Sequence, residues 1–305
     1  MVFMYTVLIT GGSGLIGKHL SQVLTDKGYS VRFLGRKKHN HVPYEQFVWD
    51  IHAGTIDDEA FRNLDFIIHL AGANISEGQW TQSRKQEIIR SRVDSTNLLY
   101  EGVKRNKVDL KAIIASSAIG FYGAVTNATV YAETDAPASD YISQVCVEWE
   151  QGTKPFNEIP TRLVTMRTGV VFTQTGGPLG KMVAPIKYGI GSALGKGSQY
   201  LPWVHIDDLC AIFVQGIENP QMVGVYNAVA PEHVTNAEVT KAIAQAIGRK
   251  IWLPNIPSFV LKLIFGEMAV IFLEGSRVSA NKIQETGFAF TYPTVAKALT
   301  NLLKK

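Results

Sequence analysis

The stretch 10-TGGSGLIG-17 decides the fold of this 305-residue chain. An apolar, β-rich run, 5-YTVLIT-10, comes directly before it, and a run with helical spacing, 16-IGKHLSQVLTDKG-28, follows it. Glycines at this spacing between a strand and a helix are the fingerprint of a dinucleotide-binding turn. The alternative is an ordinary glycine-rich turn, which the combined presence of strand, helix and spacing makes the weaker interpretation.

Each glycine of the stretch has its own task in such a turn. Gly11 permits the tight turn, Gly14 lets the backbone approach a pyrophosphate, and Gly17 lets the helix pack against the sheet. The N–H groups of the first helical turn then face the phosphates. We therefore expect these residues of the turn to contact a cofactor: Gly11, Ser13, Gly14, Leu15, Ile16 and Gly17.

Short apolar runs alternate with helical patterns through the first half of the chain. In the longest helical pattern Ile89, Val93, Thr96, Tyr100 and Val103 fall on one face. Apolar strands alternating with helices indicate parallel strands covered on both faces, so the sequence predicts an α/β fold with a Rossmann doubly wound parallel sheet. The predicted strands are 5–10, 30–35, 46–50, 65–71, 111–117 and 162–169, and the predicted helices of this half are 16–28 and 81–106.

The character of the sequence changes after about residue 170. Glycines crowd residues 176–197, where they are too many for a helix and predict loops shaped around a ligand. Helices are expected near 206–218 and 235–248, and two prolines introduce a tail from residue 252. We therefore expect a dinucleotide-binding Rossmann domain over 1–170, with core elements continuing to about 250. Residues 171–305 would hold the substrate-side loops and a smaller mixed C-terminal lobe.

The composition excludes several classes of protein. Hydrophobic residues make up 46% of the chain and charged residues 18%, which suits a buried globular core and not a disordered chain. The net charge of +4 comes without a dense Lys/Arg block, so nucleic acid is not expected as a partner. Cys146 and Cys210 form neither a disulfide framework nor a metal-ligand cluster, so we expect no metal site and a reducing, cytoplasmic location.

Two apolar segments must be distinguished from targeting and membrane segments. The N-terminal MVFMYTVLITGG has no preceding basic region and no following cleavage site, so a first strand is expected there and not a signal peptide. The run 259-FVLKLIFGEMAVIFLEG-275 is interrupted by Lys262, Gly266 and Glu267, so no membrane span is expected. A buried helical hairpin is the favoured interpretation of this run, and amphipathic membrane contact is the alternative.

The second predicted strand ends in 33-FLGRKKHN-40, where an NAD-specific site usually has a carboxylate for the ribose hydroxyls. This chain has Gly35, Arg36 and Lys37 there, and a guanidinium can form a bidentate pair with a 2′-phosphate. We therefore expect NADP(H) in preference to NAD(H), with a solvated basic turn as the alternative. Asp50, at the end of the third strand, is expected to border the adenine or to cap a turn.

Further motifs complete the pattern of a known family. With the glycine turn, 69-HLAGA-73, 116-SSAIGFYG-123 and 203-WVHIDDL-209 resemble an extended short-chain dehydrogenase/reductase. The chain resembles more narrowly the uncharacterised "epimerase family" branch, which is nucleoside-diphosphate-sugar epimerase-like and has its own small C-terminal domain, here about 252–300. The stretches that carry the narrower resemblance are 87-EIIRSRVDSTNLL-99, 140-DYISQVCVEWE-150, 167-RTGVVF-172, 176-GGPLGKM-182 and the tail 266–293.

This resemblance implies a cofactor that lies across the strand ends. Three residues would pass beneath the adenine ribose and the pyrophosphate: Leu70, Ala71 and Gly72. Ser116 is also expected at the cofactor, and Val170 would border the nicotinamide end.

Arg92 falls where extended relatives usually place an Asn, and its cation would reach the cofactor phosphates or pair with Glu87. A surface mesh of helical ion pairs is the alternative for both residues. We include both among the expected cofactor-binding residues.

The usual acid and base of the wider superfamily are missing. There a Tyr moves the substrate proton, and a Lys four residues later lowers the pKa of that Tyr, because an unperturbed phenol with a pKa of about 10 is a poor base near neutrality. If Tyr141 is that Tyr, the Lys position holds Val145. If Glu150 fixes the register, the pair becomes Ile142 and Cys146. Neither register supplies a Tyr–Lys pair.

An enzyme with this sequence would therefore need a substitute acid or base. A Tyr without its Lys would still act if Arg167 or the charge of the nicotinamide lowered its pKa. A packed core residue is the alternative for every candidate, and for Cys146 it is the favoured one. The catalytic candidates that we retain are Tyr122, Tyr141, Ser117 and His205.

The substrate side is expected between residues 176 and 205, where lysines and polar groups favour an anionic small molecule such as a nucleotide-sugar. A solvated loop is the alternative. One carboxylate of Asp207 and Asp208 is expected to cap the following helix, and His205 would contact either substrate or backbone. The expected substrate contacts are Arg167, Lys181, Gln199 and Trp203.

We expect an NADP(H)-dependent oxidoreductase or an epimerase-like isomerase that acts on an unknown small molecule. The alternative is a non-catalytic NADP(H)-binding regulator or redox sensor, a role that relatives with a degenerate Tyr–Lys pair often have. An interaction module is the third hypothesis, and a homodimer is compatible with the sequence.

Overall fold

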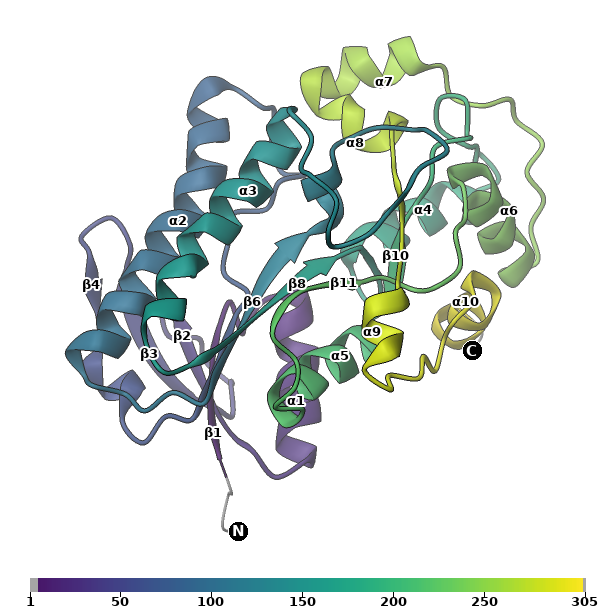
Figure 1. Ribbon diagram of the computed structural model, residues 1–305. Coiled ribbons are helices and arrows are strands. Elements are labelled where there is room, and N and C mark those ends of the chain that lie inside the picture. Colours follow the sequence, from purple (N-terminus) through teal and green to yellow (C-terminus); the bar gives the residue numbers. More distant parts are fainter. Residues whose placement is uncertain (1–4, 304–305) are drawn as a thin grey trace.

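The computed structural model describes residues 5–303, arranged as Figure 1 shows. Residues 1–4, which begin the segment expected to form the first strand, lie outside the described residues, as do 304–305. An eight-stranded sheet has the strand order β11-β8-β6-β5-β1-β2-β3-β4. Its strands are β1 Thr6–Thr10, β2 Ser30–Gly35, β3 Glu45–Asp50, β4 Thr55–Ile56, β5 Phe66–His69, β6 Ala112–Ala118, β8 Arg162–Thr168 and β11 Gly224–Ala228.

Neighbouring strands of this sheet pair in parallel, except for the antiparallel pair of β3 and β4. The order β3-β2-β1-β5-β6-β8 is that of a doubly wound Rossmann sheet, so the predicted fold class is confirmed. The strand order reverses between β1 and β5, and ligands of such sheets bind outside the carboxyl ends of the strands at this reversal. The glycine stretch follows β1 and therefore lies at that edge.

Helices cover both faces of the sheet (Figure 1). Leu24 of α1 and Phe213 of α5 belong to a buried cluster on one face, and Leu99 of α2 belongs to a cluster on the other. α3 packs along α2. The α-helices are α1 Leu15–Asp26, α2 Gln82–Arg105, α3 Tyr141–Thr153, α4 Gly177–Lys187, α5 Ile206–Glu218, α6 Asn236–Ala246, α7 Ser258–Phe265, α8 Val270–Leu273, α9 Asn281–Glu285 and α10 Val295–Leu303.

The remaining elements are short and connect these layers. The 3-10 helices are η1 Asp58–Phe61, η2 Ile119–Tyr122, η3 Lys154–Glu158 and η4 Gly266–Ala269. Two small parallel sheets pair β9 Val170–Phe172 with β10 Trp203–His205, and β7 Val130–Tyr131 with β12 Arg277–Val278.

The buried face of α2 differs at its start from the predicted face. Ile88 and Arg92 are buried, whereas the predicted Ile89 and Val93 are only half-buried. The later part of the predicted face is buried as expected. The difference has a physical reason: Arg92 is a buried cation, which a pattern of apolar residues cannot detect.

The glycine-rich stretch that was expected to form loops contains the helix α4, so the prediction was wrong there. Leu179 and Ile186 of α4 are buried in a third cluster with residues of α6 and α10. Gly177 lies in the first turn, and no atom lies within 4 Å of the position that a Cβ on Gly180 would take. Apolar residues at helical spacing therefore decide the structure of this stretch, and the glycines occupy positions where they cause no conflict.

The segment from 258 to 273 is not the buried hairpin that was expected. Met268 packs against Trp80 and Val145, so η4 covers the starts of α2 and α3. Large side chains of α7 point outward instead: Phe259 is 71% exposed and Leu263 is 84% exposed. Within residues 5–303 no helix has both the length and the apolar character needed to cross a membrane.

Candidate functional site

The turn after β1 has the geometry that the glycines predicted. Gly11 has a φ of +69°, and a Cβ on Gly17 would lie 2.5 Å from the Gly11 carbonyl oxygen. A Cβ on Gly12 would lie 2.5 Å from the Phe33 ring. Gly14 is the N-cap of α1, and no side chain caps this helix end. The N–H groups of the first turn therefore face outward at the carboxyl edge of the sheet, where they can bind an anion.

A basic segment lies beside this turn. Thr10 of β1 pairs with Leu34 of β2, so the residues after Leu34 emerge next to the glycines. Gly35 is half-buried, and Arg36 and Lys37 are exposed. Asp50, at the end of the next strand, accepts hydrogen bonds from the backbone N–H groups of His52 and Ala53. Of its two expected roles, bordering the adenine or capping a turn, these contacts are those of a turn cap.

The loop after β5 packs directly on the turn. The Thr10 hydroxyl oxygen accepts hydrogen bonds of 3.1 Å from the N–H groups of Leu70 and Ala71. A Cβ on Gly11 would lie 3.2 Å from Ala71 N, and a Cβ on Gly72 would lie 3.1 Å from the Arg92 guanidinium carbon. Residues 70–72 thus lie between the glycine turn and α2, with Leu70 and Ala71 half-buried and Gly72 exposed.

A buried hydrogen-bonded chain, which the sequence did not indicate, connects these parts. Thr10 lies 2.8 Å from Nδ1 of His69, and Nε2 of His69 lies 3.0 Å from the Thr96 hydroxyl. Thr96 donates in turn to the carbonyl of Arg92. This order makes Nδ1 the acceptor and Nε2 the donor of a neutral imidazole. Burial and the nearby Arg92 lower the pKa of His69 to about 3, so the ring stays neutral.

Side chains from three strands, β6, β8 and β11, and from α3 and η2 meet in a second buried network. Arg167 of β8 donates from Nε and Nη2 to the carboxylate of Glu150 at 2.8 and 2.9 Å, and Ser117 donates to the same carboxylate at 2.7 Å. Arg167 also donates to the Tyr122 hydroxyl at 3.0 Å, and Tyr122 donates to Asn227 of β11 at 2.7 Å. The network therefore uses two predicted catalytic residues, Tyr122 and Ser117, and one predicted substrate residue.

Tyr122 does not gain the lowered pKa that a proton-transferring phenol would need. Burial raises its pKa to about 12, and the nearby Arg167 and the hydrogen bond to Asn227 offset only part of this rise. The Tyr141 hydroxyl donates to the Lys85 carbonyl, and burial raises its pKa as well. Burial raises the pKa of the Cys146 thiol to about 12. Arg167 alone therefore does not bring the pKa of Tyr122 below that of a free phenol.

His205 is the N-cap of α5, in place of the aspartates that were expected there. Its Nδ1 accepts from the N–H of Asp207, and its ring stacks on Tyr292 at 3.8 Å. Asp208 is buried, and its carboxylate accepts hydrogen bonds from the backbone N–H groups of residues 291 and 292, which fastens the C-terminal segment. Trp203 is fully buried and stacks on Phe172, which leaves no surface for contact with substrate.

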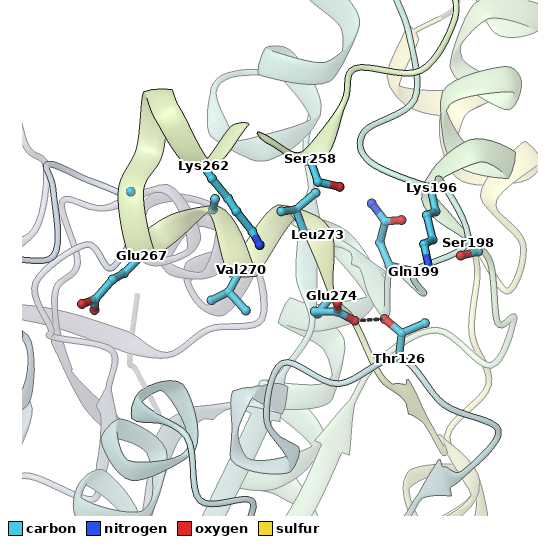
Figure 2. A pocket seen from close by; sticks show the side chains of 12 residues that line it. Thr126, Lys196, Ser198, Gln199, Ser258, Lys262, Glu267, Val270, Leu273 and Glu274 are labelled. Carbon is cyan, nitrogen blue, oxygen red and sulfur yellow. Dashed lines mark hydrogen bonds between the residues drawn. The ribbon is translucent and has the colours of Figure 1, made fainter. Parts of the chain in front are cut away.

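A cavity of about 690 Å³ lies between the segment 196–199 and the C-terminal elements α7, η4 and α8. Figure 2 shows the ammonium groups of Lys196 and Lys262 on opposite sides of Leu273. Gln199 is the one predicted substrate residue that lines this cavity, although its amide donates to two backbone carbonyls. Lys181 lies elsewhere, on the exposed side of α4.

The other predicted cofactor residues have varied positions. Glu87 pairs with Arg84 at 2.8 Å and not with Arg92. Ser116 is buried in β6, and Val170 begins β9, where its N–H donates to the Pro202 carbonyl. Among residues 5–303 no group of three or more His, Cys, Asp and Glu side chains is placed to hold a metal ion.

Comparison with known proteins identifies two regions. Residues 7–229 match the NAD dependent epimerase/dehydratase family, and residues 256–302 match a domain of unknown function (DUF1731). The epimerase family protein SDR39U1 of Homo sapiens is 32% identical over 302 residues, which are 97% of this chain and 99% of the relative. Epimerase family protein Mb2239 of Mycobacterium bovis is 34% identical over 295 residues, 96% of either chain.

Solved structures agree with this assignment. The crystal structure of human SDR39U1 (isoform 2) with NADPH has a TM-score of 0.87 and 31% identity, and the match covers 97% of this chain and 98% of that chain. MoeE5 in complex with UDP-glucuronic acid and NAD has a TM-score of 0.79, with 96% of each chain covered. At 19% identity this second structure shows the common fold alone.

Proposed function

Because the chain belongs to the NAD dependent epimerase/dehydratase family, we propose that it binds NADP(H) at the carboxyl edge of its sheet, in preference to NAD(H). The resemblance to an epimerase family with its own C-terminal domain is confirmed. The observation that carries the proposal is the open turn from Gly11 to Gly17, whose helix has no side-chain cap. The human relative solved with NADPH gives further support.

The residues present fit such a cofactor. A Cβ on Gly12 would lie 2.5 Å from the Phe33 ring and one on Gly17 2.5 Å from the Gly11 carbonyl oxygen, so only glycines let the turn and α1 pack this closely. Gly14, at the start of α1, is the glycine that lets the backbone approach a pyrophosphate in such a turn. Arg36 and Lys37 are exposed, and their positive charges can pair with a 2′-phosphate. A carboxylate at this position would repel that phosphate. When bound, the cofactor would supply a hydride. The chain supplies the backbone N–H groups, the basic segment and the floor formed by residues 70–72.

We propose that the bound cofactor serves an oxidoreductase or epimerase-like reaction on a small anionic molecule. Lys196 and Lys262, which line the cavity and take part in no salt bridge within residues 5–303, support this substrate class. Two carboxylates also line the cavity: Glu267 pairs with Lys85, and Glu274 accepts a hydrogen bond from Thr126. A nucleotide-sugar is one such anion, and MoeE5, which shares the fold, is solved with one. A cytoplasmic location and a homodimer stay predictions.

The second candidate function is NADP(H) binding without turnover, as in a regulator or redox sensor. One observation favours it: Tyr122, Ser117 and His205 are all buried and held by hydrogen bonds within the fold. Tyr141, the fourth of the predicted catalytic residues, is half-buried and not fully buried.

The cofactor preference is tested by replacing Arg36. We expect Arg36→Ala to weaken NADPH binding about tenfold and to leave NADH binding nearly unchanged, because a charge-assisted pair with the 2′-phosphate is lost in NADPH alone. Fluorescence titration of the parental and variant proteins with both cofactors measures this. Equal losses for NADPH and NADH would refute the role of Arg36.

Turnover separates the two candidate functions. NADPH oxidation is followed in the presence of a panel of carbonyl compounds and nucleotide-sugars. Substrate-dependent oxidation would establish an enzyme with a substituted acid or base. Because an epimerisation is redox-neutral and consumes no NADPH, the nucleotide-sugars are also analysed for conversion to their epimers. Tight NADPH binding with neither oxidation nor epimerisation of any compound would favour the sensor.

A further inference from the structure

The cavity beside α7 is built mainly from two distant parts of the chain. Residues from the segment 196–199 line one side, and residues between 258 and 274 line the other. The second wall lies within residues 256–302, which match the domain of unknown function. The volume of about 690 Å³ is that of a site for a small molecule and exceeds what a single ion needs.

Each wall contributes one lysine whose charge is not paired. Lys196 and Lys262 are both exposed, and within residues 5–303 no salt bridge involves either of them. Their ammonium groups lie on opposite sides of Leu273 (Figure 2). A Cβ on Gly195 would lie 2.7 Å from Leu273 Cδ2, so Leu273 packs on the backbone next to Lys196. The two cations are therefore separate binding points and not one shared point.

The carboxylates of the cavity do not pair with these lysines. Glu267 pairs with Lys85 of α2, and Glu274 accepts a hydrogen bond from the Thr126 hydroxyl. Glu274 directly follows Leu273, and its carboxylate has further lone pairs that can accept hydrogen bonds from ligand hydroxyl groups. The middle of the cavity therefore favours hydroxyl groups and disfavours a negative charge, whereas the two lysines favour negative charges.

Resting on the proposed function, we propose that the substrate is a small polyhydroxylated molecule with two separated anionic groups, one bound by Lys196 and the other by Lys262. Each group is a carboxylate or a phosphoryl group, because a lysine ammonium binds either as a point charge. Among nucleotide-sugars, the class narrows to those whose sugar carries a carboxylate. A molecule with one anionic group leaves one lysine without a partner and binds more weakly. Lys262 thus gives the domain of unknown function a part in substrate selection.

The test uses two pairs of probes whose members differ by one carboxylate. Glucarate has a carboxylate at each end of a hydroxylated chain, and gluconate, of the same length, has one. UDP-glucuronic acid and UDP-glucose differ in the same way at the sugar. Isothermal titration calorimetry measures the dissociation constants with and without saturating NADPH. The proteins are the parental chain, Lys196→Met, Lys262→Met and Lys241→Met, a control on the exposed side of α6 outside the cavity.

We expect the parental protein to bind glucarate about tenfold more tightly than gluconate, because a second charge-assisted hydrogen bond forms. Lys196→Met and Lys262→Met should each abolish this preference. Lys241→Met removes the same charge and should keep the preference, as should Lys262→Arg. This ratio of dissociation constants does not respond to a general loss of stability, so it separates substrate selection from folding.

The UDP probes assign the two ends. UDP-glucuronic acid should bind about tenfold more tightly than UDP-glucose. The lysine whose removal abolishes this preference binds the sugar carboxylate, and removal of the other lysine should weaken the binding of both UDP probes.

Equal affinities within both pairs, or binding of none of the four probes, would overturn the proposal. A preference that persists in both Lys196→Met and Lys262→Met would also overturn it, since the second anionic group would then bind elsewhere. The proposed function fails separately if the parental protein binds no NADPH, and the titrations without NADPH still decide the roles of the two lysines.

Discussion

The glycine turn after β1 and the network around Arg167 lie at the carboxyl ends of strands of the same sheet, but they treat their polar groups in opposite ways. The turn leaves the N–H groups at the start of α1 without a side-chain cap. In the network, Arg167, Glu150, Tyr122 and Asn227 satisfy one another at distances of 2.7 to 3.0 Å. One region is open to a ligand, and the other is closed by its own side chains.

This difference separates polar groups that stabilise the fold from polar groups that can bind a ligand. Buried donors and acceptors that find partners inside the protein contribute to stability, whereas groups held in place without partners are available for a ligand. Tyr122 looks catalytic in the sequence, but its contacts belong to the closed region. Arg92 was expected at the cofactor, with a surface mesh of ion pairs as the alternative, and the structure buries it next to Gly72 of the loop that packs on the glycine turn.

The largest expected effect comes from breaking the closed region. Glu150→Gln should lower the free energy of unfolding by about 3–5 kcal/mol, because Arg167 would keep a buried charge without its carboxylate. Urea unfolding measures this loss. Glu148→Gln, on the same helix and without a salt bridge in the described chain, should change stability by less than about 0.5 kcal/mol. A loss below about 1 kcal/mol for Glu150→Gln would show that the network does not stabilise the fold.

The next effect concerns the open region. Gly17→Ala should weaken NADPH binding about thirtyfold and cost roughly 1–3 kcal/mol of stability, because the new Cβ would lie 2.5 Å from the Gly11 carbonyl oxygen. Titration and urea unfolding measure the two losses. Gly180→Ala is the control, since its Cβ meets no atom within 4 Å, and it should raise stability slightly. Unchanged NADPH binding in Gly17→Ala would contradict the site.

The smallest expected effect is the loss of stability on removing the Tyr122 hydroxyl. Tyr122→Phe should cost about 1–2 kcal/mol at pH 8, because Asn227 and Arg167 each lose a partner. The folded pKa of Tyr122, about 12, lies above the value of 10.0 for a free phenol, so the unfolded chain loses this proton first. The contribution is thus complete below about pH 10 and declines as pH rises toward 12. Urea unfolding of both proteins across this range should show their stabilities converging, and a constant difference would refute the raised pKa.

Elements with a local signal could be predicted from the sequence. Apolar strands, helical spacing and the glycines of the turn gave β1, β2, β6 and α1 to within a residue or two, and with them the fold class. The glycines reveal the turn because its function depends on the backbone, which the sequence describes directly.

The rest depends on contacts between distant segments. Glu150 and Arg167 are 17 positions apart, and Tyr122 meets Asn227 across 105 positions, so no local pattern pairs them. His205 caps α5, while the carboxylate of Asp208, an expected cap, accepts from backbone groups 83 and 84 positions later. The exposed face of α7 was missed for a similar reason, since apolar character alone does not show whether another element covers it.

The most direct test of the central claim is an equilibrium titration of the parental protein with NADPH, followed by nicotinamide fluorescence. The open turn and the basic segment after β2 predict saturable binding of one NADPH per chain, tighter than the binding of NADH under the same conditions. The absence of saturable binding of either cofactor would contradict the account.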